Sequence, residues 1–266
     1  MLIEGMSLDL EDKVISVVGG GGKTSFILRL AGELAVGERV IITTTTQMER
    51  LCPKKIDRYI FAKTSNEIKE ELRSLKPGEK TILLAEGELP GNKVDGISSQ
   101  VVGEIKNITL PLDLDYESGE LIKSILVEAD GSNRKPLKGG FKEYEPVIPK
   151  ETDVVVFMVG IDALGKKLTD EHVHRAELTA KMTGLSLGAT LNETYFRKIV
   201  EFTALRAKQM SVNSKFILFI NKVDTERELN KALPIAKKLS KSDKINFDRI
   251  ILGSLQAIAP VKKVII

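Results

Sequence analysis

The sequence predicts an α/β fold in which helices flank a mostly parallel sheet. Short segments rich in β-branched residues alternate along the chain with longer segments that have the apolar period of amphipathic helices. Two short segments, VVVFMVGI from Val154 and FILFI from Phe216, are almost entirely apolar, as expected of strands buried on both faces. At 266 residues the chain is near the upper size for one hydrophobic core, so we expect a single domain over residues 1–266.

The expected elements follow one another in regular alternation. The segments with the composition of strands are Lys13–Gly19, Arg39–Thr45, Ile56–Lys63, Lys80–Glu86, Ser124–Asp130, Asp153–Gly160, Lys215–Ile220 and Asp248–Gly253. The segments with helical periodicity are Thr24–Val36, Asn66–Leu75, Ser98–Ile108, His174–Met182, Glu193–Gln209 and Glu226–Leu239. Residues 131–152 contain three prolines and three glycines and are too long for a simple connection, so we expect a functional loop there.

Composition excludes several classes of protein. Forty Lys and Arg residues against 37 Asp and Glu give a net charge of +3 without a long run of one sign, so no nucleic-acid partner is expected. The first residues are acidic where a signal peptide is basic, and the apolar runs are shorter than a membrane span, so we expect a cytoplasmic protein without a membrane partner. The only cysteine, Cys52, excludes an internal disulfide and a multi-thiolate metal site.

The segment VVGGGGKTSF predicts a phosphate-binding loop between the first strand and the first long helix. Backbone amides and a helix N-terminus gathered around one point suit a polyphosphate. Lys23 is expected to be exposed there and to reach the β- and γ-phosphates, while the Thr24 hydroxyl would bind Mg²⁺. The common spacing requires a first glycine where this chain has Val17, so we expect a variant loop. The expected nucleotide-binding residues of this loop are Gly19, Gly20, Gly21, Gly22, Lys23, Thr24 and Ser25.

An acidic strand end, VEADG, supplies a second part of the predicted site. Glu128 and Asp130 are two residues apart and would point to the same face of a strand, so both are candidate Mg²⁺ ligands and catalytic carboxylates. The Gly131 amide would contact a γ-phosphate. The alternative interpretation is an acidic turn that merely closes the strand.

The four threonines of RVIITTTTQM allow two interpretations. Residues 43–46 have high strand propensity and could form an ordinary pleated surface. A second strand that lies beside the first would instead bring Thr44 or Thr45 close to the phosphates or to Mg²⁺. We retain Thr44 as a candidate Mg²⁺ ligand.

The tetrapeptide NKVD at Asn221–Asp224 predicts recognition of guanine. The Asp224 carboxylate could accept both hydrogen bonds that the guanine edge donates, Asn221 would brace the phosphate loop, and Lys222 would cover the ring. The backbone amide of Ser254 would contact a base carbonyl. A second NKVD at Asn92–Asp95 follows a Pro-Gly turn instead of a buried strand, and we interpret it as a surface loop. The alternative role for Asp224 is an ordinary helix cap.

Two further groups of polar residues are candidates for binding. Arg134, Lys135 and Lys138 would form a basic cluster that either binds an anionic cofactor, such as a pterin phosphate or dinucleotide, or keeps the loop soluble. His172 and His174 could share a metal if their segment is extended, whereas on a helix they would point apart.

These motifs, in order, resemble the selenium-dependent hydroxylase accessory protein family often called YqeC. The resemblance rests on GGGGKTS, TTTT, VEADGSNRKPLK, EPVIP, VHRAE, TGL and NKVD and covers nearly the whole chain. It implies a P-loop protein that assists maturation of selenium-dependent molybdenum hydroxylases, with those hydroxylases or their cofactor-assembly proteins as partners. It also makes His174 and Arg175 a polar pair near the site, with Arg175 as a phosphate or substrate clamp.

A more distant similarity extends to the nickel-insertion GTPases. It involves Glu128-x-x-Gly131 and Asn221-Lys222-x-Asp224, but the Cys or His metal ligands of those proteins are not evident in this sequence. The sequence thus predicts a P-loop nucleoside triphosphatase with GTP (or ATP) and Mg²⁺, and favours a GTPase. An ATP-dependent small-molecule kinase or transferase and a nucleotide-gated carrier with negligible turnover are the alternatives. The sequence does not indicate an oligomeric state.

Overall fold

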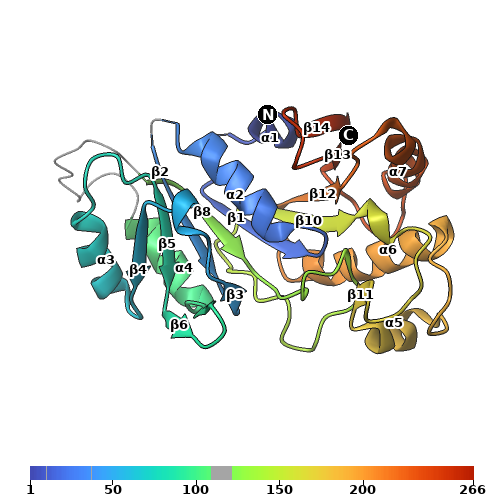
Figure 1. Ribbon diagram of the computed structural model, residues 1–266, viewed down its shortest axis with the longest axis horizontal. Helices are drawn as coiled ribbons and strands as arrows, with labels where there is room; N and C mark the ends of the chain where they lie inside the picture. The colour runs from blue at the N-terminus through green and yellow to red at the C-terminus, as the bar shows by residue number, and fades with distance from the viewer. Residues whose placement is uncertain (10, 37, 109–121) are drawn as a thin grey trace.

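A nine-stranded sheet forms the centre of the computed structural model, which describes residues 1–9, 11–36, 38–108 and 122–266 (Figure 1). All neighbouring strands are parallel except the two that come last along the chain, which are antiparallel. The predicted α/β fold with a mostly parallel sheet is therefore confirmed. In spatial order the strands are β14 (Val261–Ile265), β13 (Arg249–Gly253), β12 (Lys215–Asn221), β10 (Val154–Gly160), β1 (Val14–Gly19), β8 (Ile122–Glu128), β2 (Arg39–Thr44), β5 (Thr81–Ala85) and β4 (Arg58–Phe61).

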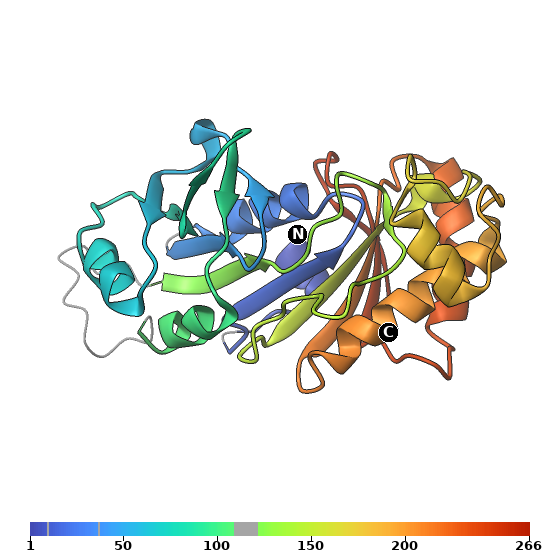
Figure 2. The ribbon, with the colours of Figure 1, turned by 90° about the horizontal axis from the view of Figure 1, so that it is seen from below.

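Helices cover both faces of this sheet. One face is covered by α1 (Leu2–Met6) and α2 (Lys23–Leu34). The other face is covered by α3 (Ser65–Arg73), α4 (Ser99–Ile108), α5 (Ala176–Thr183), α6 (Glu193–Gln209) and α7 (Glu226–Leu239). Figure 2 shows α3 and α4 at one end of the molecule and α5 and α6 at the other. Within the parts of the chain that the structure describes, none of the helices has both the length and the apolar character that a bilayer crossing requires.

The alternation of side chains along β1 explains why its sequence is apolar throughout. Val14 and Val18 pack into the core beneath α3 to α7, whereas Ile15 and Val17 pack against α1 and α2. All six residues of the strand are buried. A parallel strand with helices on both faces has no solvent-facing side, and this is the reason for the continuous apolar runs.

Small elements that the sequence did not predict surround the main sheet. They are the sheet of β3 (Met48–Glu49), β7 (Lys93–Asp95) and β6 (Gly87–Leu89), the pair β9 (Leu137–Lys138) and β11 (Val173–His174), and the 3₁₀ helices Pro53–Lys55 and Ile161–Ala163. The first NKVD therefore continues into β7, and its interpretation as a surface loop was wrong. His174 lies in β11 instead of a helix, because α5 begins only at Ala176.

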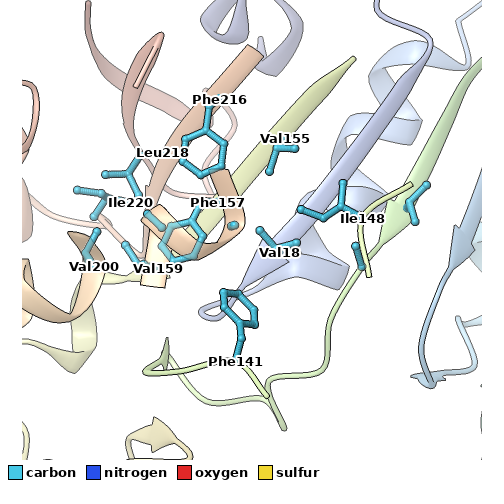
Figure 3. Close-up of a cluster of buried hydrophobic side chains, with 14 of the residues drawn as sticks. Val18, Phe141, Ile148, Val155, Phe157, Val159, Val200, Phe216, Leu218 and Ile220 are labelled. Carbon is cyan, nitrogen blue, oxygen red and sulfur yellow. The ribbon is translucent and has the colours of Figure 1, made fainter. Parts of the chain in front are cut away.

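The strands β1, β8, β10 and β12 are parallel, so their carboxyl ends meet at one edge of the sheet. The loop of residues 131–152, hereafter the long loop, leaves the end of β8 at this edge and leads back to the start of β10 at the opposite edge. Its residues Phe141 and Ile148 are buried in the core beside Val18 and Phe157 (Figure 3). The long loop is thus packed against the sheet and fixed close to the phosphate loop.

Candidate functional site

Glycine is required throughout the predicted phosphate loop, which consists of Gly19, Gly20, Gly21 and Gly22 between β1 and α2. The φ angle is +95° at Gly19, +79° at Gly21 and +119° at Gly22, in the region that side chains rarely adopt. A Cβ atom on Gly21 would also lie 2.3 Å from the amide nitrogen of Gly160. The loop is therefore held tightly against the neighbouring strand ends and is not a free hinge.

The backbone amides of the loop differ from those of the first turn of α2 in their hydrogen-bond acceptors. The Gly19 amide donates to both carboxylate oxygens of Asp130, at 3.2 and 3.0 Å, and the Gly21 amide donates to the carbonyl of Lys135 at 2.9 Å. The first N–H groups of an α-helix have no acceptor within the helix, and α2 begins after Gly22 without a side-chain cap. The amides of the first turn of α2 are therefore donors of the kind that can bind an anion.

Lys23 is buried, which corrects the expectation that it is exposed. Its ammonium group donates to the carbonyl of Gly19 at 3.0 Å and to the hydroxyl of Ser132 at 2.9 Å. It also lies 3.3 Å from Asp130 and 3.8 Å from Glu128. Both carboxylates belong to the carboxyl end of β8 and draw the ammonium inward, so the glycine loop and the acidic strand end lie side by side.

Glu128 and Thr24, both predicted Mg²⁺ ligands, are in direct contact. The Thr24 hydroxyl donates to Glu128 Oε2 at 2.9 Å, so two oxygen ligands of the type that Mg²⁺ prefers are in contact. Burial raises the pKa of Glu128, against the opposing effects of the Lys23 ammonium and the Thr24 hydroxyl. Among the described residues, no group of three or more His, Cys, Asp and Glu side chains could hold a metal. Water and phosphate oxygens would have to complete the coordination, as is usual for Mg²⁺.

Asp130 starts a chain of buried charges that leads away from the phosphate loop. It lies 3.0 Å from the ammonium of Lys138, which is 3.2 Å from the carboxylate of Glu145, and Glu145 accepts a 2.7 Å hydrogen bond from Arg175. Lys138 also donates to the carbonyl of Gly131 at 2.7 Å. We call Asp130, Lys138, Glu145 and Arg175 the charge chain. Asp130 is thus bound by two ammonium groups and the Gly19 amide, whereas Glu128 alone contacts Thr24.

The charge chain shifts the pKa values of its neighbours. Burial raises the pKa of Glu145, but Arg175 and Lys138 outweigh it and lower this pKa to about 2. Burial and the same two cations lower the pKa of His174 to about 4, so this imidazole is neutral at pH 7. Both shifts make the network sensitive to acid.

The predicted basic cluster is not assembled. Lys138 is fully buried in its ion pairs, and Arg134 is largely exposed and pairs with Glu49 on β3. Arg175, expected as a phosphate or substrate clamp, is held by Glu145. These pairings correct the ligand roles expected for Lys138 and Arg175. The reason is that Glu145, at the far end of the long loop, folds back to neutralise both cations.

Thr44 and Thr45 bind the backbone. The Thr44 hydroxyl donates to the carbonyl of Glu128 at 2.8 Å and accepts from the Thr46 amide at 3.1 Å. The Thr45 hydroxyl donates to the carbonyl of Val147 at 2.6 Å. Thr44 is fully buried, so its expected role as a Mg²⁺ ligand is corrected to that of a link between β2 and β8.

The second NKVD lies beside the phosphate loop. The Asn221 side-chain amide donates to the carbonyl of Gly21 at 2.7 Å, and its oxygen accepts from the Leu255 amide at 3.3 Å. Asn221 therefore braces the phosphate loop, as predicted. Lys222 has a φ of +63° and forms a 2.7 Å ion pair with Asp162 at the surface.

Ser254 reaches this part of the site by its hydroxyl instead of its amide. The hydroxyl donates to Asp224 Oδ1 at 2.6 Å, while the backbone amide donates to the carbonyl of Pro260 at 2.9 Å. The predicted contact between the Ser254 amide and a base carbonyl is thus corrected. The acceptor belongs to the turn before β14, a strand that the sequence did not predict.

A cavity of about 760 Å³ connects the two motifs and continues along the outer side of α2. This volume is in the range of small-molecule sites in proteins. Its walls include, from the phosphate loop and from the second NKVD, Gly21, Gly22, Ser25, Asn221, Lys222 and Asp224.

Sequence reasoning missed several residues of the site. Ser132 contacts Lys23, Glu145 completes the charge chain, and Asp162 pairs with Lys222. Ser132 and Glu145 lie within the segments VEADGSNRKPLK and EPVIP, which contributed to the family resemblance but did not give these two residues a role.

Comparisons with known proteins agree with the predicted family. The profile of the family described as "YqeC protein" matches residues 15–177 of this chain. The chain is also 31% identical over 253 residues to the "Uncharacterized protein YqeC" of Escherichia coli (strain K12), a match that covers 91% of this chain and 88% of the relative. No solved structure gives a significant match. The matched length and the identity show that the chain belongs to the YqeC family.

Proposed function

We propose that this chain binds and hydrolyses a nucleoside triphosphate with Mg²⁺ and that it prefers GTP. The main support for this proposal is that one cavity has both the phosphate loop and the Asn221–Asp224 segment in its walls. The hydrogen bond from Asn221 to the carbonyl of Gly21 fixes these two parts relative to each other. A ligand that fills the cavity would place its phosphates at one motif and its base at the other.

The phosphate end would bind through the first turn of α2 and through Lys23. Helix N-terminal amides and an ammonium group are the usual donors to phosphate oxygens. Lys23 now binds Asp130 and Ser132, and it would turn toward the β- and γ-phosphates when they enter. The Gly131 amide remains a predicted γ-phosphate contact, supported by the open space around Gly131, where an added Cβ would meet nothing within 4 Å.

Thr24 and Glu128 would hold Mg²⁺, which would neutralise charge on the β- and γ-phosphate oxygens. Lys23 would stabilise the charge that develops as water attacks the γ-phosphate. Glu128 lies in a buried position with a raised pKa, where it could also orient the attacking water. Asp130 would position the phosphate loop through the Gly19 amide instead of contacting the metal.

The base end supports guanine. Asp224 is at the cavity wall and accepts one hydrogen bond, from Ser254, on Oδ1. A carboxylate oxygen has two acceptor positions, so enough acceptors remain for the N1–H and 2-amino donors of guanine. Adenine has neither donor in that arrangement and would leave Asp224 without its partners.

The kinase or transferase alternative is less well supported by the structure. Lys138 and Arg175 were candidates for holding an acceptor, but each of them is paired with Glu145. The role in maturation of selenium-dependent molybdenum hydroxylases rests on the family resemblance, and we propose it on that basis. Purification of the protein with a hydroxylase or a cofactor-assembly protein, identified by mass spectrometry, would support it.

Measurement of phosphate release from GTP with and without Mg²⁺ tests the proposed reaction. We expect Mg²⁺-dependent turnover that Glu128→Gln lowers by about 100-fold while nucleotide still binds, because this contact matters most as γ-phosphate charge develops. Glu70→Gln on α3 is the control, since Glu70 pairs with Arg73 on the same helix and does not contact Thr24. Tight binding without phosphate release would support a carrier, and absence of nucleotide binding would contradict the proposal.

A further inference from the structure

A second hollow lies between the tip of the long loop and helices α5 and α6, and we call it the loop–α6 groove. Its volume is about 400 Å³. Phe141, Lys142 and Glu143 of the long loop form one wall, and Met182 of α5 contributes to the groove. The other wall consists of α6 residues Phe202, Leu205, Arg206 and Gln209.

The α6 wall combines two large apolar side chains with two polar ones. Phe202, Leu205, Arg206 and Gln209 have the spacing i, i+3, i+4 and i+7, which places them on one side of the helix over about 10 Å. Phe202 and Leu205 are each 37% exposed, and so is Met182 across the groove. Large apolar side chains that remain exposed next to one another mark a surface for a partner.

The groove is preformed. Phe141 is buried and points into the core toward the strands (Figure 3), which anchors the loop wall from below. Gly140 lies so close to α5 that a Cβ atom there would be 3.2 Å from Met182 Sδ. Arg206 donates a 2.7 Å hydrogen bond to the carbonyl of Glu143 and so ties the two walls together. A partner would therefore meet the groove without the entropy loss of ordering it.

The charges around the groove determine what can bind. Lys142 and Arg206 contribute two cations, against the single carboxylate of Glu143. Arg206 bonds to a backbone carbonyl, so that contact leaves its charge uncompensated. The complement of this surface is a row of apolar side chains flanked by carboxylates. We propose that the loop–α6 groove binds an acidic amphipathic helix of a partner protein.

A helix fits this groove better than a membrane does. The groove is a hollow between two walls, whereas insertion into a bilayer requires apolar side chains that project outward. The backbone groups of α6 are paired within the helix, so a partner can contact this wall only through side chains. Side-chain contact at i, i+3, i+4 and i+7 positions is how an amphipathic helix binds a groove.

Fluorescence anisotropy with two labelled peptides tests the proposal. Both probes are 16-residue helices with leucines at i, i+3, i+4 and i+7, and their remaining exposed positions carry glutamates in one and lysines in the other. We expect the full chain to bind the acidic peptide at least about tenfold more tightly than the basic one. We expect the double variant Lys142→Glu/Arg206→Glu to reverse this preference and Leu205→Gln to weaken both peptides.

The control carries the same change of charge on another element, Lys262→Glu/Lys263→Glu on β14, and should behave like the wild type. Thermal melting of each variant verifies that it is folded. Equal affinity for the two peptides, or an unchanged preference in the reversed variant, would overturn the proposal. Binding to phosphatidylserine vesicles that the Lys142→Glu/Arg206→Glu change abolishes, without binding of the acidic peptide, would overturn it in favour of a membrane surface.

Discussion

The tetrapeptide Asn-Lys-Val-Asp occurs twice in this chain, and the two copies have different surroundings. The first, Asn92–Asp95, begins in the turn after β6 and continues through β7 of the small antiparallel sheet. The second, Asn221–Asp224, starts at the last residue of β12, a buried parallel strand. Identical residues therefore lie in a hairpin in one place and at the phosphate loop in the other.

The contacts of the two copies differ accordingly. In the first, the carbonyl of Asn92 accepts from the Arg50 amide at 2.9 Å, and the carbonyl of Asp95 accepts from the Glu86 amide at 3.0 Å. These two contacts involve backbone atoms alone. In the second, the side chain of Asn221 braces Gly21. The comparison teaches that the end of a parallel strand, where loops from several strands meet, gives a short motif its chemical use.

The largest effect is expected where the second copy meets the phosphate loop. Lys23→Met should lower the affinity for Mg²⁺-GTP by at least about 100-fold, because a charge-assisted contact to phosphate is lost. Methionine has a similar volume, so it avoids the cavity that alanine would leave at this buried position. Isothermal titration calorimetry measures the change.

Lys55→Met is the matched control, because Lys55 lines the same cavity away from the phosphate loop. We expect its affinity to stay within a few-fold of the wild type. Equal losses in the two variants would mean that cavity charge as a whole, and not the phosphate loop, governs binding.

The effect of pH on stability also distinguishes the surroundings of the two copies. The charge chain belongs to the candidate site, where the second copy lies. The pKa of Glu145 falls from 4.5 to about 2 on folding, so its stabilisation is present above pH 4.5 and is lost as the pH falls toward 2. Glu145→Gln should lower the free energy of unfolding at pH 7 by about 3 kcal/mol and flatten its dependence over this window. Denaturant unfolding at a series of pH values provides the test.

Glu143→Gln, an exposed neighbour on the same loop, should change neither the stability nor its pH dependence. The His174 pKa is lowered to about 4, so His174 also makes the protein less stable as the pH falls from 6.5 toward 4. This part of the pH dependence should remain in both variants. A Glu145→Gln variant that is as stable as the wild type at pH 7 would show that the buried ion pairs do not hold the long loop.

The first copy should matter for stability alone. Gly96, directly after it, lies where a Cβ atom would be 2.4 Å from the carbonyl of Thr46 and 2.6 Å from that of Thr44. Gly96→Ala should therefore lower the free energy of unfolding by about 1–3 kcal/mol without changing base preference. Gly87→Ala, where nothing lies within 4 Å of the added Cβ, should have much less effect in the same denaturant titration. A change of nucleotide preference in Gly96→Ala would contradict the division of roles.

The sequence was sufficient to predict every strand of the main sheet except β14. Long apolar strands such as β10 and β12 are buried on both faces, so their pattern is strong, whereas the two residues of β9 are too few to show any period. β14 was missed because its segment, VKKVI, carries exposed lysines at the edge of the sheet. Because β14 was not predicted, the hydrogen bond from the Ser254 amide to the carbonyl of Pro260, just before that strand, was not predicted either.

The charge chain shows why site residues are harder to predict than strands. A lysine that becomes buried, such as Lys138, has the same letter as one on the surface, and Arg175, which binds the same Glu145, lies far away in the sequence. Burial of Lys138 depends on Glu145, to which the motif EPVIP assigned no role. By contrast, the approach of Lys23 to Glu128 and Asp130 could be predicted, because both are fixed by adjacent parallel strands.

Competition binding with Asp224→Asn and Asp95→Asn tests the central claim most directly. Each protein is titrated with GTP, ATP and xanthosine triphosphate in the presence of Mg²⁺. Wild type and Asp95→Asn should both prefer GTP to ATP by about 100-fold, because the exposed Asp224 carboxylate gains two charge-assisted hydrogen bonds from guanine that adenine cannot donate. Asp224→Asn should lose GTP and gain the xanthine nucleotide, since its amide can donate to the 2-oxo group. Equal affinity of the wild type for ATP and GTP, or a switch of base preference in Asp95→Asn, would contradict the account.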